Sequence, residues 1–118
     1  LKNDAYWVLS PTKGAVFILT PRNMTTYEVH TLIKKEHRGK KAIELGKEAT
    51  KWFFENSTCE KLISWCPATN PRAKIFAQLV GFEIDCLLTK SIKLNGELDD
   101  QWQVSLEKEK FLCPPPSL

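Results

Sequence analysis

A basic segment that contains a glycine is the part of the chain best suited to bind phosphate. Arg38-Gly39-Lys40-Lys41-Ala42 follows an apolar stretch and opens a segment with helical periodicity. The first N–H groups of a helix have no intrahelical acceptor, and the helix dipole favours negative charge at that end. The sequence therefore predicts a phosphate site at 38–42, to which the side chains of Arg38, Lys40 and Lys41 add positive charge.

A second polar group stands farther along the chain, again where a helix is expected to begin. Asn70-Pro71-Arg72-Ala73 precedes an apolar stripe that stops at Gly81-Phe82. Pro71 suits the first helical position, Thr69 or Asn70 suits the cap, and glycine suits the position after a helix. The sequence thus predicts two polar helix N-termini separated by one short apolar strand.

Glu28 and His30 are the residues whose types suit proton transfer. They are two apart in a predicted strand and therefore share one face. A carboxylate or an imidazole can accept a proton from an amine near neutral pH. Each also has a plain structural interpretation, a solvated strand glutamate and a partly buried histidine, and both interpretations stay open. For His37, beside the basic segment, we expect a turn or phosphate contact.

Length and composition predict one folded domain, 1–118. The chain has 118 residues, an apolar fraction of 42% and a formal charge of +3. This charge does not require a nucleic-acid partner, and the basic run Lys34–Lys41 has a solvated face as its alternative explanation. The sequence holds no apolar run long enough to span a membrane, and we expect a cytoplasmic protein.

The four cysteines do not suggest a metal site. Cys59, Cys66, Cys86 and Cys113 form no Cys-x-x-Cys pair. They allow two disulfides in a secreted protein, or reduced, buried thiols in a chain that buries its own core. We favour the second interpretation because Cys66 and Cys86 lie in apolar runs that resemble strands.

The order of predicted elements indicates an α+β (mixed α/β) fold. The predicted strands are Ala5–Leu9, Gly14–Leu19, Met24–Ile33, Lys61–Cys66, Phe82–Leu88 and Gln101–Leu106, and the predicted helices are Gly39–Glu55 and Pro71–Gly81. Such an order predicts a mostly antiparallel, twisted sheet with helices on both faces. Asn95-Gly96 predicts a turn, and the proline-rich tail 112–118 is expected to be extended.

The two polar groups together resemble the GNAT superfamily of acetyltransferases. The resemblance rests on 38–42 and on the spacing of Asn70, Ala73, Gly81 and Phe82. It covers about Tyr6 to Leu106, is similar in style to the ribosomal-protein acetyltransferase-like branch, and extends to bacteriophage-encoded members. The family's first strand and first two helices are missing, which suggests an N-terminally incomplete segment.

The resemblance implies acetyl-CoA as cofactor and a sheet splayed at the cofactor site. The implied cofactor-binding residues are Leu32, Ile33, Lys34, Arg38, Gly39, Lys40, Lys41, Ala42, Asn70, Arg72 and Phe76, and the implied catalytic residues are Glu28 and His30. Three positions depart from the family pattern. Lys41 replaces a glycine of the phosphate loop, Ile43 stands where the loop has glycine or alanine, and Ala77 replaces the tyrosine that many members carry there.

The resemblance implies an N-acetyltransferase in which a primary amine attacks the thioester directly. The amine would belong to a protein or a small molecule, and a homodimer is compatible with this interpretation. One alternative is a GNAT-fold module without turnover that acts through a protein partner. Another is a small basic nucleic-acid-binding domain that uses Lys34–Lys41, although it leaves Asn70 and Gly81-Phe82 unexplained.

Overall fold

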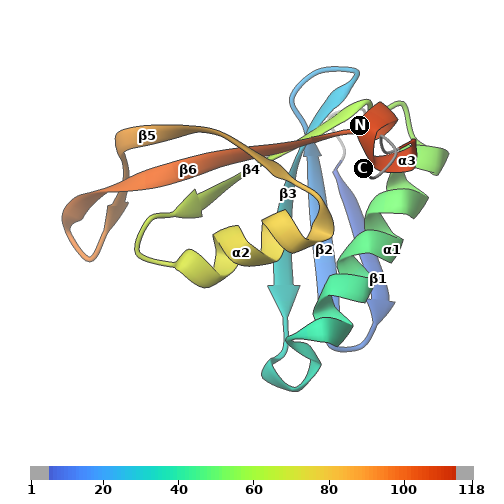
Figure 1. Cartoon of the computed structure of the whole chain (residues 1–118), viewed down its shortest axis with the longest axis horizontal. Coiled ribbons are helices and arrows are strands. Elements are labelled where there is room, and N and C mark those ends of the chain that lie inside the picture. Colours follow the sequence, from blue (N-terminus) through green and yellow to red (C-terminus); the bar gives the residue numbers. More distant parts are fainter. Residues whose placement is uncertain (1–5, 114–118) are drawn as a thin grey trace, which may run out of the picture.

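Six strands form one open sheet that carries the other elements. The computed structural model describes residues 6–113. The strands are β1 (Trp7–Thr12), β2 (Ala15–Pro21), β3 (Thr26–Ile33), β4 (Lys61–Pro67), β5 (Glu83–Leu94) and β6 (Glu97–Glu107). The helices are α1 (Lys40–Asn56), α2 (Pro71–Val80) and α3 (Lys108–Leu112), and a 3-10 turn, η1 (Lys35–His37), precedes α1 (Figure 1).

The sheet is mostly antiparallel. Its strand order is β1-β2-β3-β4-β6-β5. Within residues 6–113, β3 and β4 are the parallel neighbours, and the other neighbouring strands pair antiparallel. A parallel pair needs a crossover connection, which α1 supplies between β3 and β4. The predicted α+β class with a mostly antiparallel sheet is therefore confirmed.

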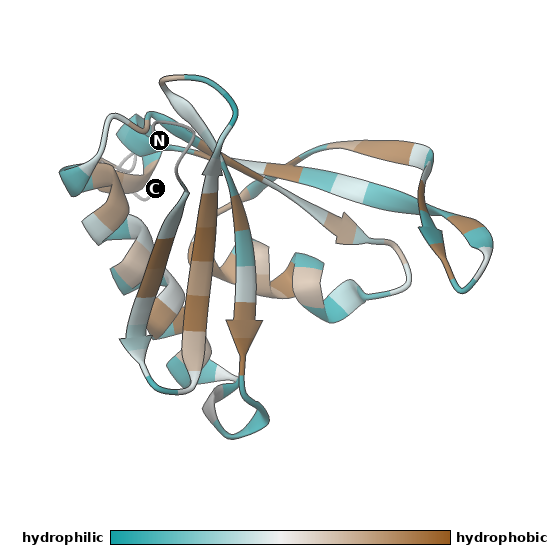
Figure 2. Cartoon of the chain, turned by 180° about the vertical axis from the view of Figure 1, so that it is seen from behind, coloured by the Kyte–Doolittle hydropathy of each residue, from teal (hydrophilic) through white to brown (hydrophobic). Residues whose placement is uncertain are grey.

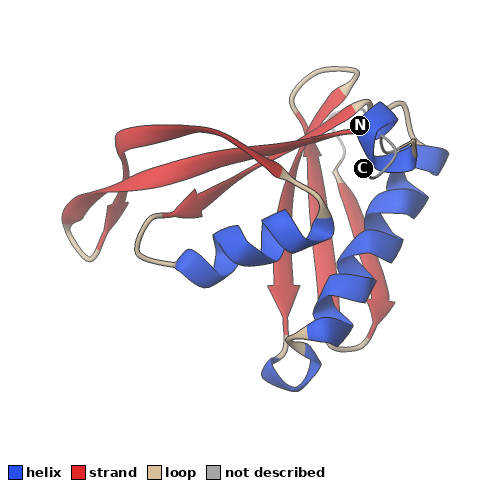
Figure 3. Cartoon of the chain, viewed as in Figure 1, coloured by secondary structure: helices blue, strands red, loops and turns tan. Residues whose placement is uncertain are grey.

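Both long helices cover the same face of the sheet. Figure 3 shows α1 and α2 in front of the strands, and Figure 2, seen from behind, shows the strands in front of both helices. On β3, Tyr27 and Val29 pack against the core beneath α1, whereas the alternating residues Glu28, His30 and Leu32 face the other side. We expected helices on both faces. In the described part of the chain, the face that carries Leu32 is uncovered, and Leu32 is 63% exposed.

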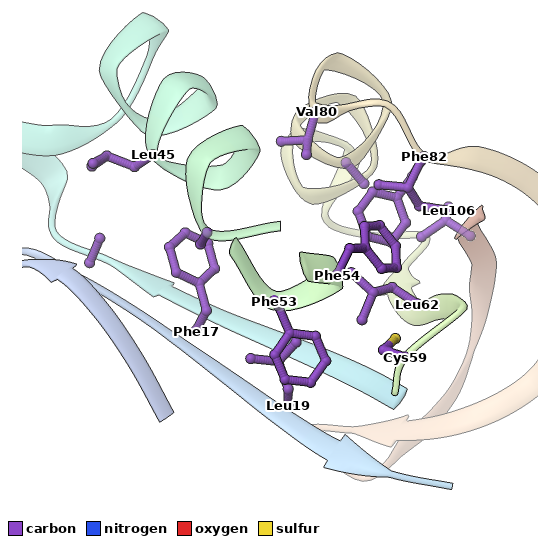
Figure 4. Close-up of a cluster of buried hydrophobic side chains, with 14 of the residues drawn as sticks. Phe17, Leu19, Leu45, Phe53, Phe54, Cys59, Leu62, Val80, Phe82 and Leu106 are labelled. Carbon is purple, nitrogen blue, oxygen red and sulfur yellow. The ribbon is translucent and has the colours of Figure 1, made fainter. Parts of the chain in front are cut away.

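The core lies between the helices and the sheet, and aromatic side chains of α1 fill its centre. Phe53 and Phe54 are fully buried together with Leu62 of β4 (Figure 4), and Val104 of β6 is fully buried as well. Phe53 makes an edge-to-face contact with Trp7 at a centroid distance of 5.3 Å. The apolar stripe of α1 faces this core, whereas Trp52 is 45% exposed.

The β5–β6 hairpin is longer than the sequence pattern suggested. Its turn lies at Asn95 and Gly96, with φ of 51° and 82°, and Leu94 pairs with Glu97 across it. The predicted turn is confirmed, since a two-residue hairpin of this kind needs positive φ at both positions. The expected strand ended at Leu88 because polar residues follow it. In the structure β5 continues past them, with a shift of its register to β6 between Leu88 and Ile92.

Two further elements differ from the sequence expectation. β1 continues through Pro11 to Thr12, which is compatible with its place at the edge of the sheet, where a ladder N–H can be missing. α3 was not predicted, because five residues are too few for a periodic pattern. Residues 114–118 of the expected extended tail lie outside the described residues. Within 6–113, no helix has the length and apolar character needed to cross a membrane.

Candidate functional site

The parallel pair in the centre of the sheet separates after three residue pairs. β3 and β4 pair at Thr26–Lys61, Tyr27–Leu62 and Glu28–Ile63, and not beyond. Each strand stays paired on its outer side, β3 with β2 as far as Ile33 and β4 with β6 as far as Pro67. The hydroxyl of Ser64 donates a hydrogen bond of 3.0 Å to the carbonyl of Val29 at the point of separation. Beyond it, the facing backbone edges of the two strands are available to a ligand.

A cavity of about 760 Å³ occupies this separation. Its walls come from β3, the start of α1, β4 and α2, and include Val29, His30, Thr31, Leu32, Ile33, Arg38, Gly39, Ala42, Ile43, Gly46, Ser64, Trp65, Cys66, Asn70, Arg72, Ala73, Phe76 and Ala77. Side chains from both faces of β3 contribute, since His30 and Leu32 alternate with Val29 and Thr31. The cavity therefore lies in the gap between β3 and β4 and not on one side of the sheet alone.

The N-terminus of α1 opens at this cavity without a side-chain capping hydrogen bond. Gly39 is the N-cap, its first intrahelical partner is the N–H of Ile43 at 3.2 Å, and the first turn holds no acidic residue. The N–H groups of Lys40, Lys41 and Ala42 therefore have no intrahelical acceptor. Gly39 has φ of 89° and ψ of −143°, a backbone conformation that side chains other than hydrogen disfavour. A Cβ at this position would meet nothing within 4 Å. The backbone conformation, and not a lack of space, therefore requires glycine here.

The residues predicted to bind the cofactor separate into two groups. Leu32, Ile33, Arg38, Gly39, Ala42, Asn70, Arg72 and Phe76 line the cavity, whereas Lys34, Lys40 and Lys41 are exposed outside its lining. The N–H of Lys34 is occupied by the carbonyl of Gly14 at 2.8 Å. Arg38 is fixed near the cavity by a hydrogen bond of 3.4 Å from Nε to the carbonyl of Ile33.

Asn70 is the N-cap of α2, but its side chain makes no capping hydrogen bond. Its backbone joins the turn, where its N–H donates to Pro67 and its carbonyl accepts from Ala73. Pro71 occupies the first helical position, as predicted. The amide side chain of Asn70 is consequently available to the cavity that it lines.

Gly81 and Phe82 serve the fold. Gly81, with φ of 132°, ends α2, and its N–H donates to the carbonyls of Ala77 and Gln78. Phe82 is buried in the core. This confirms the predicted helix stop, and it explains the spacing of the motif by the geometry of the helix end.

Glu28 and His30 lie together where the pairing of β3 with β4 ends. Glu28 is buried, with a relative exposure of 7%, and Arg22 forms an ion pair with its Oε1. Nε2 of His30 lies 2.6 Å from Oε2 of Glu28. The interpretation of Glu28 as a solvated strand residue is therefore wrong. His30 lines the cavity and its side chain is half-exposed.

Several residues of the site escaped the sequence analysis. Arg22 follows β2 in a turn and carries no pattern that marks it. Ser64 and Trp65 looked like ordinary strand residues. Gly46 interrupts the apolar stripe of α1, and that interruption was the available signal. A Cβ on Gly46 would lie 2.9 Å from Cγ2 of Val80, so this glycine allows α1 and α2 to approach closely beside the cavity.

The four cysteines are free thiols in two environments. Cys59 and Cys66 are buried, whereas Cys86 and Cys113 are exposed, so the expectation of a buried Cys86 was wrong. Cys86 lies on β5, which has a single neighbouring strand at the sheet edge. Cys66 lines the cavity, and burial raises the pKa of its thiol while Lys74 lowers it. Among residues 6–113, no three His, Cys, Asp or Glu side chains gather as a metal site would need.

Solved structures that resemble this chain include spermidine N-acetyltransferases. Spermidine N-acetyltransferase from Vibrio cholerae, in complex with CoA and spermine, has a TM-score of 0.75 at 24% identity, over 84% of this chain and 60% of that chain. A chimera of Vibrio cholerae SpeG and hSSAT has a TM-score of 0.77 at 23% identity, over 85% and 62%. The dodecameric spermidine N-acetyltransferase from Vibrio cholerae has a TM-score of 0.76 at 23% identity, over 87% of this chain and 62% of that chain.

The likeness at these identities establishes the fold, which is that of the GNAT acetyltransferases. This chain spans about three fifths of the length of those structures. No curated protein shows significant sequence similarity to the chain. Residues 10–103 match the family described as "Protein of unknown function (DUF2824)". This match spans most of the sequence, and the chain therefore belongs to the DUF2824 family.

Proposed function

We propose that this chain is an N-acetyltransferase that transfers acetyl from acetyl-CoA to a primary amine. The observation that supports this most directly is the cavity between the separated ends of β3 and β4, which meets the uncapped N-terminus of α1. An extended, polar arm needs free backbone edges, and a pyrophosphate needs N–H groups and cations. This cavity offers both, on neighbouring elements.

The chain's residues fit the parts of acetyl-CoA as follows. The free backbone edge of β3 near Leu32 and Ile33 would bind the pantetheine arm, and Asn70 would add a side-chain amide from the opposite wall. The N–H groups of 40–42, with Arg38 and Arg72, would bind the phosphates. When bound, the cofactor supplies an activated acetyl thioester.

The exposed side chains of Lys34, Lys40 and Lys41 take a different role from the backbone N–H groups of 40–42. Their ammonium groups would raise the positive potential around the entrance without contacting the phosphates through fixed geometry, so their effect would be screened by salt. Lys41 therefore does not crowd the cavity, although it stands where the family pattern has glycine.

Acetyl transfer requires that the acceptor ammonium lose a proton before it attacks. His30 and Glu28 are the titratable pair beside the separation, and either side chain is chemically able to accept that proton. The C–N bond then forms, the C–S bond breaks, and CoA leaves as a thiolate that takes up a proton. Ala77 is buried and offers no acidic group, so that proton comes from the nitrogen or from water.

The acceptor is proposed only as a primary amine of a protein or small molecule. Spermidine belongs in the acceptor screen because the structural neighbours are spermidine acetyltransferases. We also propose a single domain, a cytoplasmic location and a homodimer. A relationship to the ribosomal-protein branch or to bacteriophage-encoded members is likewise a proposal.

Calorimetric titration with acetyl-CoA tests the proposal, with CoA and ATP as comparators. We expect the wild-type chain to bind acetyl-CoA, and Arg38→Glu to abolish binding because it places like charge at the phosphates. Lys93→Glu is the matched control, since it makes the same charge change on the exposed surface of β5. A folded wild-type chain that binds no acetyl-CoA would refute the enzyme and favour a module that acts through a protein partner.

A further inference from the structure

Glu28 is a buried carboxylate with both of its oxygens engaged. Arg22 holds Oε1, and His30 holds Oε2. Burying a charge is costly unless it is paired and hydrogen-bonded, and here a guanidinium lies at one oxygen and an imidazole nitrogen at the other. A carboxylate in this state is poorly placed to accept a proton from a substrate. It also does not line the cavity, whereas His30 does.

Arg22 is itself held from two sides. Its guanidinium pairs with Glu28 and stacks over the ring of Trp65 at 5.4 Å from the centroid. Trp65 is fixed in turn by a hydrogen bond of 3.3 Å from its indole N–H to the side chain of Gln103 on β6. The position of Glu28 is thus determined by a chain of contacts that reaches from the β2–β3 turn across β4 to β6.

The position of His30 follows from these contacts. Its Nε2 faces the carboxylate, so in the neutral ring the proton belongs on Nε2 and the lone pair on Nδ1. We propose that His30 is the general base of the acetyl transfer, with Glu28 and Arg22 as positioning residues that fix its tautomer and orientation. This inference rests on the proposed function, which left the base undecided between His30 and Glu28.

The proton balance of the step is as follows. An ammonium acceptor, R–NH3⁺, gives one proton to Nδ1 of His30, and the freed amine attacks the thioester carbon. As the C–N bond forms and the C–S bond breaks, the nitrogen gives up a second proton, which the departing thiolate takes. His30 then returns its proton to solvent, so that one amide, one CoA thiol and one proton are released.

The tautomer of His30 can be measured without any turnover. The chain has two histidines, and His37→Gln assigns their signals in a long-range ¹H–¹⁵N spectrum. We expect the neutral ring of His30 to carry its proton on Nε2, and to lose this preference in Glu28→Gln. A proton on Nδ1, or a tautomer indifferent to Glu28→Gln, would overturn the inference whether or not the protein is an acetyltransferase.

The catalytic role is tested with two amines of different basicity. n-Butylamine is protonated at neutral pH and needs a base, whereas O-methylhydroxylamine is unprotonated and does not. We expect His30→Gln to lower kcat for n-butylamine by about 10²- to 10⁴-fold, to lower it far less for O-methylhydroxylamine, and to leave acetyl-CoA binding unchanged. An equal loss of kcat with both amines, or no loss, would contradict the assignment of His30.

The positioning role of Arg22 must be tested by kcat, which would not change if its ion pair only stabilised the fold. We expect Arg22→Gln to lower kcat for n-butylamine on the order of tenfold with KM unchanged, and Arg22→Lys to restore most of that rate. Glu48→Gln, on the exposed face of α1, is the control. If Arg22→Gln lowers Tm but leaves kcat unchanged, Arg22 has a structural role only. A wild-type chain that binds acetyl-CoA but acetylates neither amine would refute a small-molecule acceptor, while the tautomer measurement still decides the arrangement of His30.

Discussion

Gly39 combines a structural and a functional requirement in one residue. Its φ of 89° is a conformation that favours glycine, and it places the free N–H groups of α1 at the cavity. Gly96 has a similar φ of 82° in the β5–β6 turn, with equally open space around it. Both glycines therefore have a positive φ that disfavours a side chain, and only the first belongs to the site.

This pair separates backbone strain from ligand binding. Because a side chain disfavours these conformations, we expect Gly39→Ala and Gly96→Ala each to lower the free energy of unfolding by about 1–3 kcal/mol. Acetyl-CoA affinity should fall in Gly39→Ala alone, since only there do the N–H groups change direction. Chemical denaturation and calorimetry measure the two effects. Equal affinity in both variants would mean that the N-terminus of α1 does not bind the cofactor.

Residue types and spacing predicted the site candidates that lie at the starts of helices. They did not predict residues whose contacts are made only in the tertiary fold. Arg38, Gly39 and Asn70 stand at positions that local sequence marks, and the structure places them in the cavity lining. Arg22 reaches Glu28 only because the β2–β3 turn brings it back beside the strand. A single sequence does not reveal such a contact. The roles of these residues in binding and catalysis stay predictions.

At the scale of elements, the close approach of α1 and α2 shapes one wall of the cavity. Gly46 lies on α1 where Val80 and Phe76 of α2 come nearest, and Phe76 also lines the cavity. The hairpins and the two long helices were predictable because their apolar periods are regular. The separation of β3 from β4 was expected only through the family resemblance, because each strand remains regular in sequence and the register of their pairing is a long-range property.

Replacement of Gly46 tests this packing. Alanine in a helix interior is favoured over glycine by about 1 kcal/mol, but overpacking a core costs about 1–3 kcal/mol. A Cβ at 2.9 Å from Val80 and 3.2 Å from Phe76 leaves no room without a shift. We therefore expect Gly46→Ala to destabilise the protein by up to about 2 kcal/mol in chemical denaturation. The loss should shrink when it is measured in a Val80→Ala background. A stabilised Gly46→Ala variant would show that the helices separate easily.

At the scale of the whole molecule, all the described helices lie toward one side, and this arrangement was not foreseen. α1 and α2 contact each other through Gly46, and α3 joins α1 through Phe54 and Phe111 at a centroid distance of 5.9 Å. The amphipathic pattern of a helix predicts which of its faces is buried, but it does not predict which side of the sheet the helix packs against. The mixed class and the order of elements could be predicted, because they depend on local patterns and on the need for a crossover.

The stability of the whole molecule should decline at alkaline pH for a reason located in the core. Burial raises the pKa of the Cys59 thiol from 9.0 to about 11, with smaller opposing contributions from the backbone at Lys61 and Tyr27. The folded state therefore keeps a proton that the unfolded state releases above pH 9. The stabilisation is complete below about pH 9 and is lost as the pH rises toward 11, to a total of about 3 kcal/mol.

Chemical denaturation at several pH values should show this loss in the wild type and in Cys113→Ala, which removes an exposed thiol. Cys59→Ala should start lower, because it leaves a small cavity, but it should lack this part of the decline. An identical slope in Cys59→Ala would assign the alkaline loss to the lysines instead.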